Sequence, residues 1–447
     1  MTDAASLPKP NADPQLWADF QALCDFGGRL AGTASEAAAL DFARARLAAV
    51  PGARVREDPV TYPGWRCRTA QLTNARTGVS FPCTPLLGTA SAAGVVADVL
   101  DLGLGRREDF ARHADRIGGR IVMVRHEYPF APGHVHRRVK LAWAQEMGAV
   151  GFLIAHPERG VGPVSGSSGR NGGAGIPALG IGVEAADALR PLPDGALPTA
   201  RMVIDGEDHP ASTRTLIADL PGRGGDWVVI SAHIDGHPLG ESAIDNGTGV
   251  AVALALARLL ASHVSGCPRG LRICLFSAEE WGLLGSRLWL ERMDAVERRS
   301  MLLDINLDSV AGAAGLTALT SGFARLDAWV KDTAALASEA SGQRGHSIGA
   351  RAGHSPEPGS SARAALATHL PLMANSDHAN FAAHGIPALR LIAGFNAPDS
   401  NLRLLLTAAD TRDKVRPDEV DAALKLATAL TWEALTAPAT TLAGLAM

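Results

Sequence analysis

The spacing of hydrophobic residues divides the chain into three parts. Residues 14–50 place apolar side chains at helical intervals, with an interruption at the glycine-rich "DFGGRLAGT". From residue 53 to about residue 89, apolar and polar residues alternate, as in "ARVREDPVTYPGW", which predicts short strands. Strand and helix patterns then alternate, for example in "GGRIVMVRH" and "GIPALGIGVEAADAL", and predict a compact inserted unit. The predicted division is 1–89, 90–205 and 206–447.

From residue 213 onwards, short apolar strands alternate with Ala- and Leu-rich helices. The clearest predicted strands are "WVVISAH", "LRICLFSA", "SMLLDINLDSV" and "IPALRLIA". This alternation predicts an α/β fold with a mixed, mostly parallel sheet sandwiched by helices, whose ligands gather at the carboxyl ends of the strands. The segment 341–378, rich in Gly, Ser, Pro and His, fits no element and is interpreted as a loop that covers the site or is partly mobile.

Ionisable residues stand at the ends of these predicted strands. One histidine and four carboxylates do so: His233, Asp245, Glu279, Glu280 and Asp308. Adjacent carboxylates such as Glu279 and Glu280 repel each other unless a cation or a shared proton offsets the repulsion. Asp235 lies two residues after His233, on the same face of a strand, and is expected to hold the second ring nitrogen of that histidine. The set predicts a site for a pair of divalent metal ions, with one carboxylate left over as a base.

Seven other histidines have no matching partners in their segments. They are interpreted as surface or structural residues: His113, His126, His134, His136, His156, His209 and His263.

Composition and charge narrow the class of partner. Hydrophobic residues make up 47% of the 447 residues, enough for the cores of two or three domains. The net charge is −4 and the basic residues form no stripe, which argues against nucleic acid or an anionic membrane as the main partner. A small substrate is therefore expected, and a homo-oligomer stays open.

The cysteines and the N-terminus bear on location. Five scattered cysteines without a Cys-x-x-Cys pair fit reduced thiols better than disulfides. The first twenty residues lack the pattern of a secretory signal, and no uninterrupted apolar run appears long enough to cross a bilayer. The expected location is the cytoplasm.

Five motifs resemble those of a known family, the co-catalytic zinc aminopeptidases, which also include glutamate carboxypeptidases and glutaminyl cyclases. They are "AHIDG", "AIDNGTGVA", "FSAEEWGLLGS", "INLDSV" and "SDHANFAAHGIPAL", in the order and spacing of the family. The resemblance implies the zinc aminopeptidase fold, with residues 1–89 as the N-terminal part of the peptidase domain and residues 206–447 as its catalytic part. The unit 90–205 resembles a β-rich protease-associated domain and is expected to limit substrate size without supplying ligands.

The same resemblance implies a role for each motif residue. His233 and Asp308 would bind one metal ion, Glu280 the other, and Asp245 both, while Glu279 would be the general base towards a metal-activated water. A cis peptide bond is implied directly after Asp245.

One position departs from the family pattern. The last metal ligand of the family is a histidine, and in "LLLTAADTRDKV" Leu406 stands in its place. Either a neighbouring histidine substitutes for it, or the second metal is weak or absent; the candidates are His378, His354 and His237. His378 belongs to the "SDH" motif, which in the family shapes the substrate pocket. The resulting expectation is a divalent metal, zinc, with one tight site and a second, weaker one.

The leading functional hypothesis is a metal-dependent hydrolase of amide bonds, most simply an aminopeptidase. Hydrolysis of a non-peptide amide or aryl amine is the alternative, because Leu405 and Leu406 would make the pocket drier. A third hypothesis is a non-enzymatic, ligand-binding relic, against which the retained Glu279 argues, since a binder needs no catalytic base. Cyclisation of N-terminal glutamine is disfavoured, because the cyclases depend on the metal position that lost its histidine.

Overall fold

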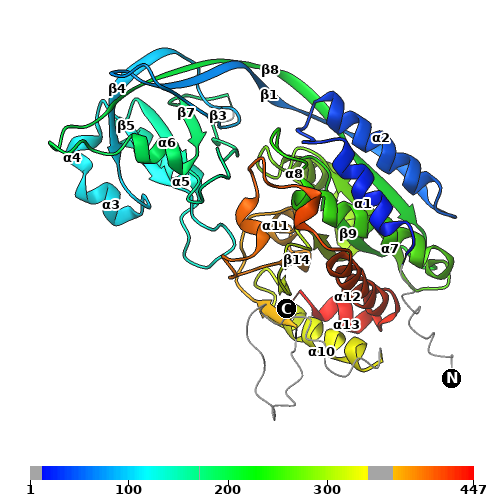
Figure 1. The fold of residues 1–447 in the computed structure, drawn as a ribbon. Coiled ribbons are helices and arrows are strands. Elements are labelled where there is room, and N and C mark those ends of the chain that lie inside the picture. Colours follow the sequence, from blue (N-terminus) through cyan, green and yellow to red (C-terminus); the bar gives the residue numbers. More distant parts are fainter. Residues whose placement is uncertain (1–12, 171, 341–365, 447) are drawn as a thin grey trace.

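The computed structural model describes residues 13–170, 172–340 and 366–446 and shows two groups of strands joined by one long ribbon (Figure 1). The ribbon consists of β1 (Arg54–Asn74) and β8 (Thr199–Leu220), which pair antiparallel along almost their whole length. One end of the ribbon borders the sheet of the C-terminal half, and the other end borders the inserted unit.

The sequence predicted short strands where β1 is one strand of 21 residues. Pro59 and Pro63 lie within it, although proline cannot donate a backbone hydrogen bond. β1 is an edge strand over this stretch, paired with β8 alone, and an edge strand tolerates proline where no second partner needs its N–H.

The large sheet of the C-terminal half has the mixed, mostly parallel form that the sequence predicted. Its order is β13 (Ala367–His369), β12 (Leu316–Leu319), β14 (Ala388–Ala393), β11 (Met301–Leu307), β9 (Trp227–His233), β10 (Gly270–Phe276) and β8. The four central strands β14, β11, β9 and β10 run parallel, whereas β12 and β8 run antiparallel to their neighbours β14 and β10. The carboxyl ends of the four central strands therefore meet along one edge.

Helices cover both faces of this sheet. One face packs against α1 (Leu16–Asp25), α2 (Ala34–Ala48), α7 (Thr248–Val264) and α12 (Pro417–Thr436), and α10 (Ala324–Ala340) packs against α12. The other face packs against α8 (Leu284–Arg292) and α11 (His378–Ala383). Alternation along β9 separates the two cores, since Val228 and Ile230 face the first set of helices and Val229 faces the second. The remaining short helices are α9 (Ala295–Ser300) and α13 (Ala439–Gly444).

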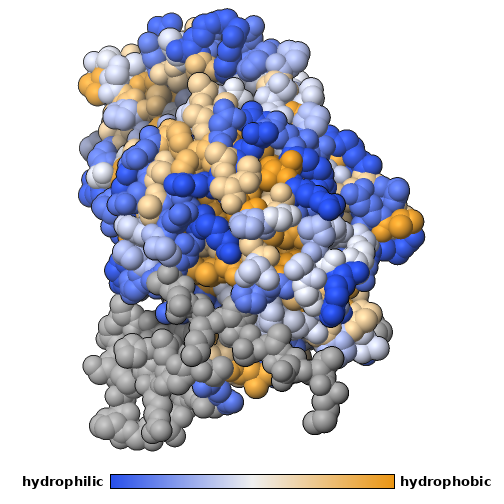
Figure 2. All heavy atoms as spheres, turned by 90° about the vertical axis from the view of Figure 1, so that its right-hand side faces the viewer, coloured by the Kyte–Doolittle hydropathy of each residue, from blue (hydrophilic) through white to orange (hydrophobic). Residues whose placement is uncertain are grey.

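Figure 2 views the molecule from the side on which α1, α2 and α12 lie. Hydrophilic residues surround an area near the centre of this face where hydrophobic residues gather. The helices of this layer are amphipathic; α2, for example, buries Leu40, Ala43 and Leu47. The stretch 243–264, which contains α7, is long and apolar enough to cross a membrane, but 72% of its most apolar part is buried inside the protein, as in a core helix.

The inserted unit has its own strands and helices. From β8 the strand order continues through β4 (Ala92–Asp101), β5 (Ile121–Arg125), β6 (Gly151–Ala155), β7 (Ala178–Ile181) and β3 (Cys83–Pro85), and β2 (Ser80–Phe81) pairs with β1. Its helices are α3 (Arg107–Arg112), α4 (Ala114–Ile117), α5 (Arg137–Glu146) and α6 (Val183–Ala188). The boundaries 90 and 205 stay a prediction, because β8 passes from one group of strands to the other without a break.

Candidate active site

The structure brings three of the predicted ligands to one point. His233 is the last residue of β9, Asp308 follows β11 directly, and Asp245 lies in the short turn Ala243–Gly247 before α7. Their ligand atoms all lie within 4.8 Å of one another. The Nε2 atom of His233 is 3.0 Å from Asp245 Oδ1 and 3.6 Å from Asp308 Oδ1. Because the strands are parallel, their carboxyl ends place these residues on the same edge.

Asp235 is close to His233, but it does not hold the imidazole in the expected way. The Nδ1 atom of His233 is 3.0 Å from the backbone carbonyl of Asp235 and 3.8 Å from its carboxylate. β9 ends at His233, so the alternation of a strand does not extend to residue 235. The contact with the carbonyl still turns Nε2 towards the carboxylates.

The carboxylate of Asp235 supports the other half of the site. Its two oxygens accept hydrogen bonds from the backbone N–H groups of Glu279 (3.1 Å) and Glu280 (3.2 Å). Asp235 is fully buried, so this arrangement is shielded from water. It fixes the turn after β10 that carries both glutamates.

Electrostatics at Glu279 and Glu280 call for positive charge. Burial and mutual repulsion raise the pKa of Glu279 well above its ordinary value, and burial together with Asp245 does the same for Glu280. Four carboxylates in one buried region are costly unless a cation compensates them. Carboxylate oxygens and an imidazole nitrogen are donors that suit a divalent cation such as zinc, so the residues present fit a metal ion.

Asp410 positions the turn that carries Asp245. Its Oδ1 accepts a hydrogen bond of 2.8 Å from the Ile244 N–H and its Oδ2 one of 3.3 Å from the Asp245 N–H. Burial raises the pKa of Asp410 to about 7. The peptide bond between Asp245 and Asn246 is cis, as the resemblance implied. Asp410 belongs to the segment "LLLTAADTRDKV", and the sequence alone predicted no such role for it.

Arg390, on β14, is a residue that the sequence did not single out. Its Nη2 atom is 3.1 Å from Asp308 Oδ1, and its guanidinium lies over the ring of Phe130 at 5.2 Å. Burial opposes ionisation of Asp308, but Arg390 and His233 outweigh it and hold the pKa of that carboxyl below its ordinary value. The signal that could have identified Arg390 is its charge within an otherwise apolar predicted strand.

Three histidines were candidates to replace the ligand missing at Leu406. His354 lies outside the described residues. The ring of His378 is fully buried, and neither of its nitrogens has a hydrogen-bond partner among the described residues; burial and Arg390 lower its pKa to about 3. His237 brings its Nε2 to 2.6 Å from Glu280 Oε2, and burial and Arg137 lower its pKa to about 3.

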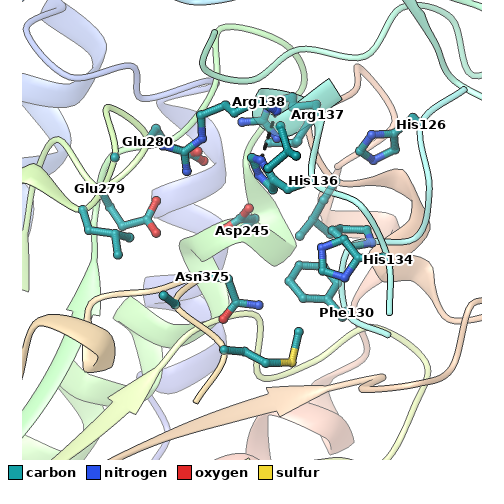
Figure 3. A pocket seen from close by; sticks show the side chains of 18 of the residues that line it. His126, Phe130, His134, His136, Arg137, Arg138, Asp245, Glu279, Glu280 and Asn375 are labelled. Atoms are coloured by element: carbon teal, nitrogen blue, oxygen red, sulfur yellow. Dashed lines mark hydrogen bonds between the residues drawn. The ribbon is translucent and has the colours of Figure 1, made fainter. Parts of the chain in front are cut away.

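A cavity of about 790 Å³ opens over these groups (Figure 3). Asp245, Glu279, Glu280 and Asp308 line it from the large sheet, together with Leu405, Leu406 and Asn375. Both polar atoms of the Asn375 amide are buried without a hydrogen-bond partner among the described residues. An unsatisfied amide facing a cavity is available to a bound molecule.

The inserted unit supplies the opposite wall of the cavity. That wall includes His126, Phe130, His134, His136, Arg137 and Arg138 (Figure 3). His126, His134 and His136 were interpreted as surface or structural residues; they line this wall, and His136 also caps α5 by accepting a hydrogen bond of 3.2 Å from the Arg138 N–H. The segment that carries them crosses to the large sheet, where the Phe130 carbonyl accepts a hydrogen bond of 2.8 Å from the Asn396 N–H. A contact so distant in sequence leaves no local signal.

Comparison with known proteins agrees with this geometry. Residues 215–431 match the model of peptidase family M28, and residues 88–189 match that of the PA domain. Aminopeptidase YwaD of Bacillus subtilis is 29% identical over 224 residues, which are 48% of this chain and 44% of that protein. The probable lipoprotein aminopeptidase LpqL of Mycobacterium tuberculosis is 30% identical over 201 residues, 44% of this chain and 37% of that protein. These alignments span less than half of each relative.

Solved structures share the fold over nearly the whole chain. The peptidase M28 precursor from Shewanella amazonensis has a TM-score of 0.76 at 22% identity, covering 96% of this chain and 95% of that one. BSAP, a zinc aminopeptidase from Bacillus subtilis, has a TM-score of 0.73 at 23% identity and covers 96% of both chains. Sequence motifs, site geometry and fold agree that residues 215–431 form a domain of peptidase family M28 and residues 88–189 a PA domain.

Proposed function

We propose that this protein is a zinc-dependent hydrolase of amide bonds, most simply an aminopeptidase that removes the N-terminal residue of small peptides. The observation that carries the proposal is the convergence of His233, Asp245 and Asp308, with Glu279 on the next strand end. The relatives named above as aminopeptidases, one of them a zinc aminopeptidase, support the same activity.

His233, Asp245 and Asp308 are the proposed ligands of one divalent ion. When bound, such an ion supplies a Lewis acid that polarises the substrate carbonyl and makes a water molecule more acidic. The carbonyl of Asp235 keeps Nε2 of His233 directed to the site, and Asp410 keeps Asp245 in place. Glu280 is assigned to a second ion.

Glu279 is the proposed general base. A carboxylate whose pKa is raised by burial and by a like charge accepts a proton more readily than an exposed one. Glu279 lines the cavity, so it can take a proton from the attacking water and return it to the nitrogen of the leaving amine. The backbone N–H of Glu279 donates a hydrogen bond to Asp235, which fixes the backbone from which the Glu279 side chain extends.

The PA domain bounds the space for the substrate. Arg137, Arg138 and His136 face the glutamates across the cavity (Figure 3). A cavity of about 790 Å³ closed on two sides suits a short peptide or a small amide better than a folded protein.

A panel of substrates tests the proposal. Purified protein loaded with zinc would be assayed on aminoacyl-arylamides, on dipeptides and tripeptides, and on N-acetylated forms of each. Hydrolysis that requires a free amino terminus supports an aminopeptidase. Equal hydrolysis of acetylated arylamides would favour the non-peptide amide alternative, and no zinc-dependent hydrolysis of any member would refute the proposal.

The proposed location is a reducing compartment, the cytoplasm. All five cysteines are unpaired, and Cys24, Cys267 and Cys274 are buried, which supports reduced thiols. A small substrate and no nucleic acid or membrane partner remain part of the proposal.

A further inference from the structure

We propose that His237 binds a second divalent metal ion together with Glu280 and Asp245, and that Ser165 of the PA domain holds the His237 ring in place. The inference rests on the proposed function, because it places this ion beside the one assigned to His233. It replaces the histidine that the chain lacks at position 406 with one from a different loop.

Because residue 406 is a leucine, the loop that carries it offers no nitrogen ligand that could share a metal ion with Glu280. The Leu406 side chain is apolar, lines the cavity and packs against two hydrophobic clusters. Two carboxylates alone, Asp245 and Glu280, hold a transition metal loosely. A tight second site therefore needs a donor from elsewhere.

His237 has the position and the free atom that this site needs. Its Nε2 is 2.6 Å from Glu280 Oε2, yet the two atoms are not aligned as a hydrogen bond, and Nε2 has no other partner among the described residues. Glu280 Oε1 is likewise buried without a partner. Unsatisfied buried polar atoms are costly, and a cation that both groups face would satisfy them together.

Ser165 fixes which ring nitrogen is available. Its hydroxyl oxygen is 3.2 Å from His237 Nδ1, so a neutral ring that donates from Nδ1 keeps the lone pair of Nε2 towards Glu280. The N–H of Ser165 donates a hydrogen bond of 2.7 Å to the Leu406 carbonyl. Ser165 thus connects the loop that lacks the histidine with the loop that supplies one.

The surroundings favour His237 over His378. Both rings are almost fully buried, and each has an arginine nearby, Arg390 beside His378 and Arg137 beside His237, so neighbouring positive charge does not separate them. The contact with a carboxylate does, because His237 Nε2 lies 2.6 Å from Glu280 Oε2, whereas no carboxylate contact to the His378 ring is found among the described residues. Its backbone is also held, since its N–H donates to Ser242 Oγ at 3.2 Å.

The number of zinc ions bound per chain tests the proposal directly. Full-length protein would be stripped with a chelator, reloaded with zinc and dialysed, and the zinc per chain measured by mass spectrometry, with zinc titration calorimetry for affinities. We expect two ions in the wild type, one in His237→Ala, and two in the matched control His378→Ala. Ser165→Ala should keep both sites but bind the second ion about 10- to 100-fold more weakly.

A double variant guards against a folding defect. Leu406→His added to His237→Ala supplies an imidazole from the other loop and should restore the second ion. Glu280→Gln should lose the same ion as His237→Ala, with circular dichroism checking the fold of each. Two tightly held ions in His237→Ala, or a single ion in the wild type, would overturn the inference.

The outcome is separable from that of the proposed function. Two ions that depend on His237, in a protein that hydrolyses no amide, would refute the proposed function and leave the inference intact. Zinc-dependent hydrolysis with one ion in the wild type would do the opposite.

Discussion

The carboxylate of Asp235 accepts a hydrogen bond of 3.1 Å from the backbone N–H of Glu279. Through this contact the chain after β9 supports the end of β10, so the residue two positions after a proposed metal ligand also positions the proposed base. The two halves of the site are coupled by backbone hydrogen bonds as well as by the metal-binding side chains.

Replacing Asp235 should therefore lower turnover more than it weakens substrate binding. Asp235→Ala removes the acceptor for two backbone N–H groups, and we expect kcat to fall by about 10- to 100-fold with little change in KM. Asp235→Asn keeps one oxygen and should lose less. Steady-state kinetics on both variants checks this, and equal kcat in Asp235→Ala and wild type would contradict it.

Glu279→Gln should abolish most activity while the protein keeps its zinc. The amide cannot accept the proton, and a general base contributes a factor of about 100 to 10,000 in rate. The measurements are kcat and zinc per chain. A variant with more than about a tenth of the wild-type kcat would show that another group is the base.

In the metal-free protein, the contribution of Glu279, Glu280 and His233 to stability should fall as pH rises from about 5 to 8. Burial raises the pKa of Glu279 and Glu280 above the value of about 4.3 expected in the unfolded chain, and the pKa of His233 is raised as well despite burial. All three groups bind more protons in the folded state over this range, so their contribution falls as pH increases.

The matched comparison is metal-free Glu280→Gln, which lacks one of the charges. Its melting temperature should exceed that of metal-free wild type by a margin that widens between pH 5 and pH 8. Other titrating groups are shared by the two proteins and largely cancel. A margin that stays constant or narrows would mean that Glu280 carries no charge penalty in the folded state.

Arg137→Met should weaken substrate binding without removing metal. The guanidinium faces the cavity, and its Nε donates to the Ser167 carbonyl at 3.1 Å, so the PA domain fixes its position. We expect KM to rise several-fold with kcat changed by less than about a factor of three. Arg107→Met, an exposed arginine of the same domain, is the control. An unchanged KM in Arg137→Met would show that this wall of the PA domain does not take part in substrate binding.

Much of the fold followed from the sequence because it depends on local patterns. Short apolar strands alternating with helices predicted the mixed sheet, and parallel strands predicted that His233, Asp245 and Asp308 would meet. The resemblance added the cis bond after Asp245. These features depend on residue order within one element or one motif.

Features built from distant segments could not be predicted in the same way. His237 meets Ser165 across 72 positions, and Arg390 meets Asp308 across 82. Asp235 shows a different limit, because the strand rule that placed it beside His233 stops where β9 ends. Local periodicity predicts which side a residue faces, but the partner depends on how the loops close over the sheet.

The ribbon of β1 and β8 makes the shape of the cavity a matter of strand register. Its paired positions run from Arg54 and Asp219 near the large sheet to Asn74 and Ala200 beside the PA domain, with one shift between Cys67 and Thr69. A residue inserted into either strand would displace every later pair and turn its side chains to the opposite face. The PA domain, and with it one wall of the cavity, would then be displaced relative to the large sheet. The strand register of the ribbon therefore sets the distance between two otherwise separate surfaces.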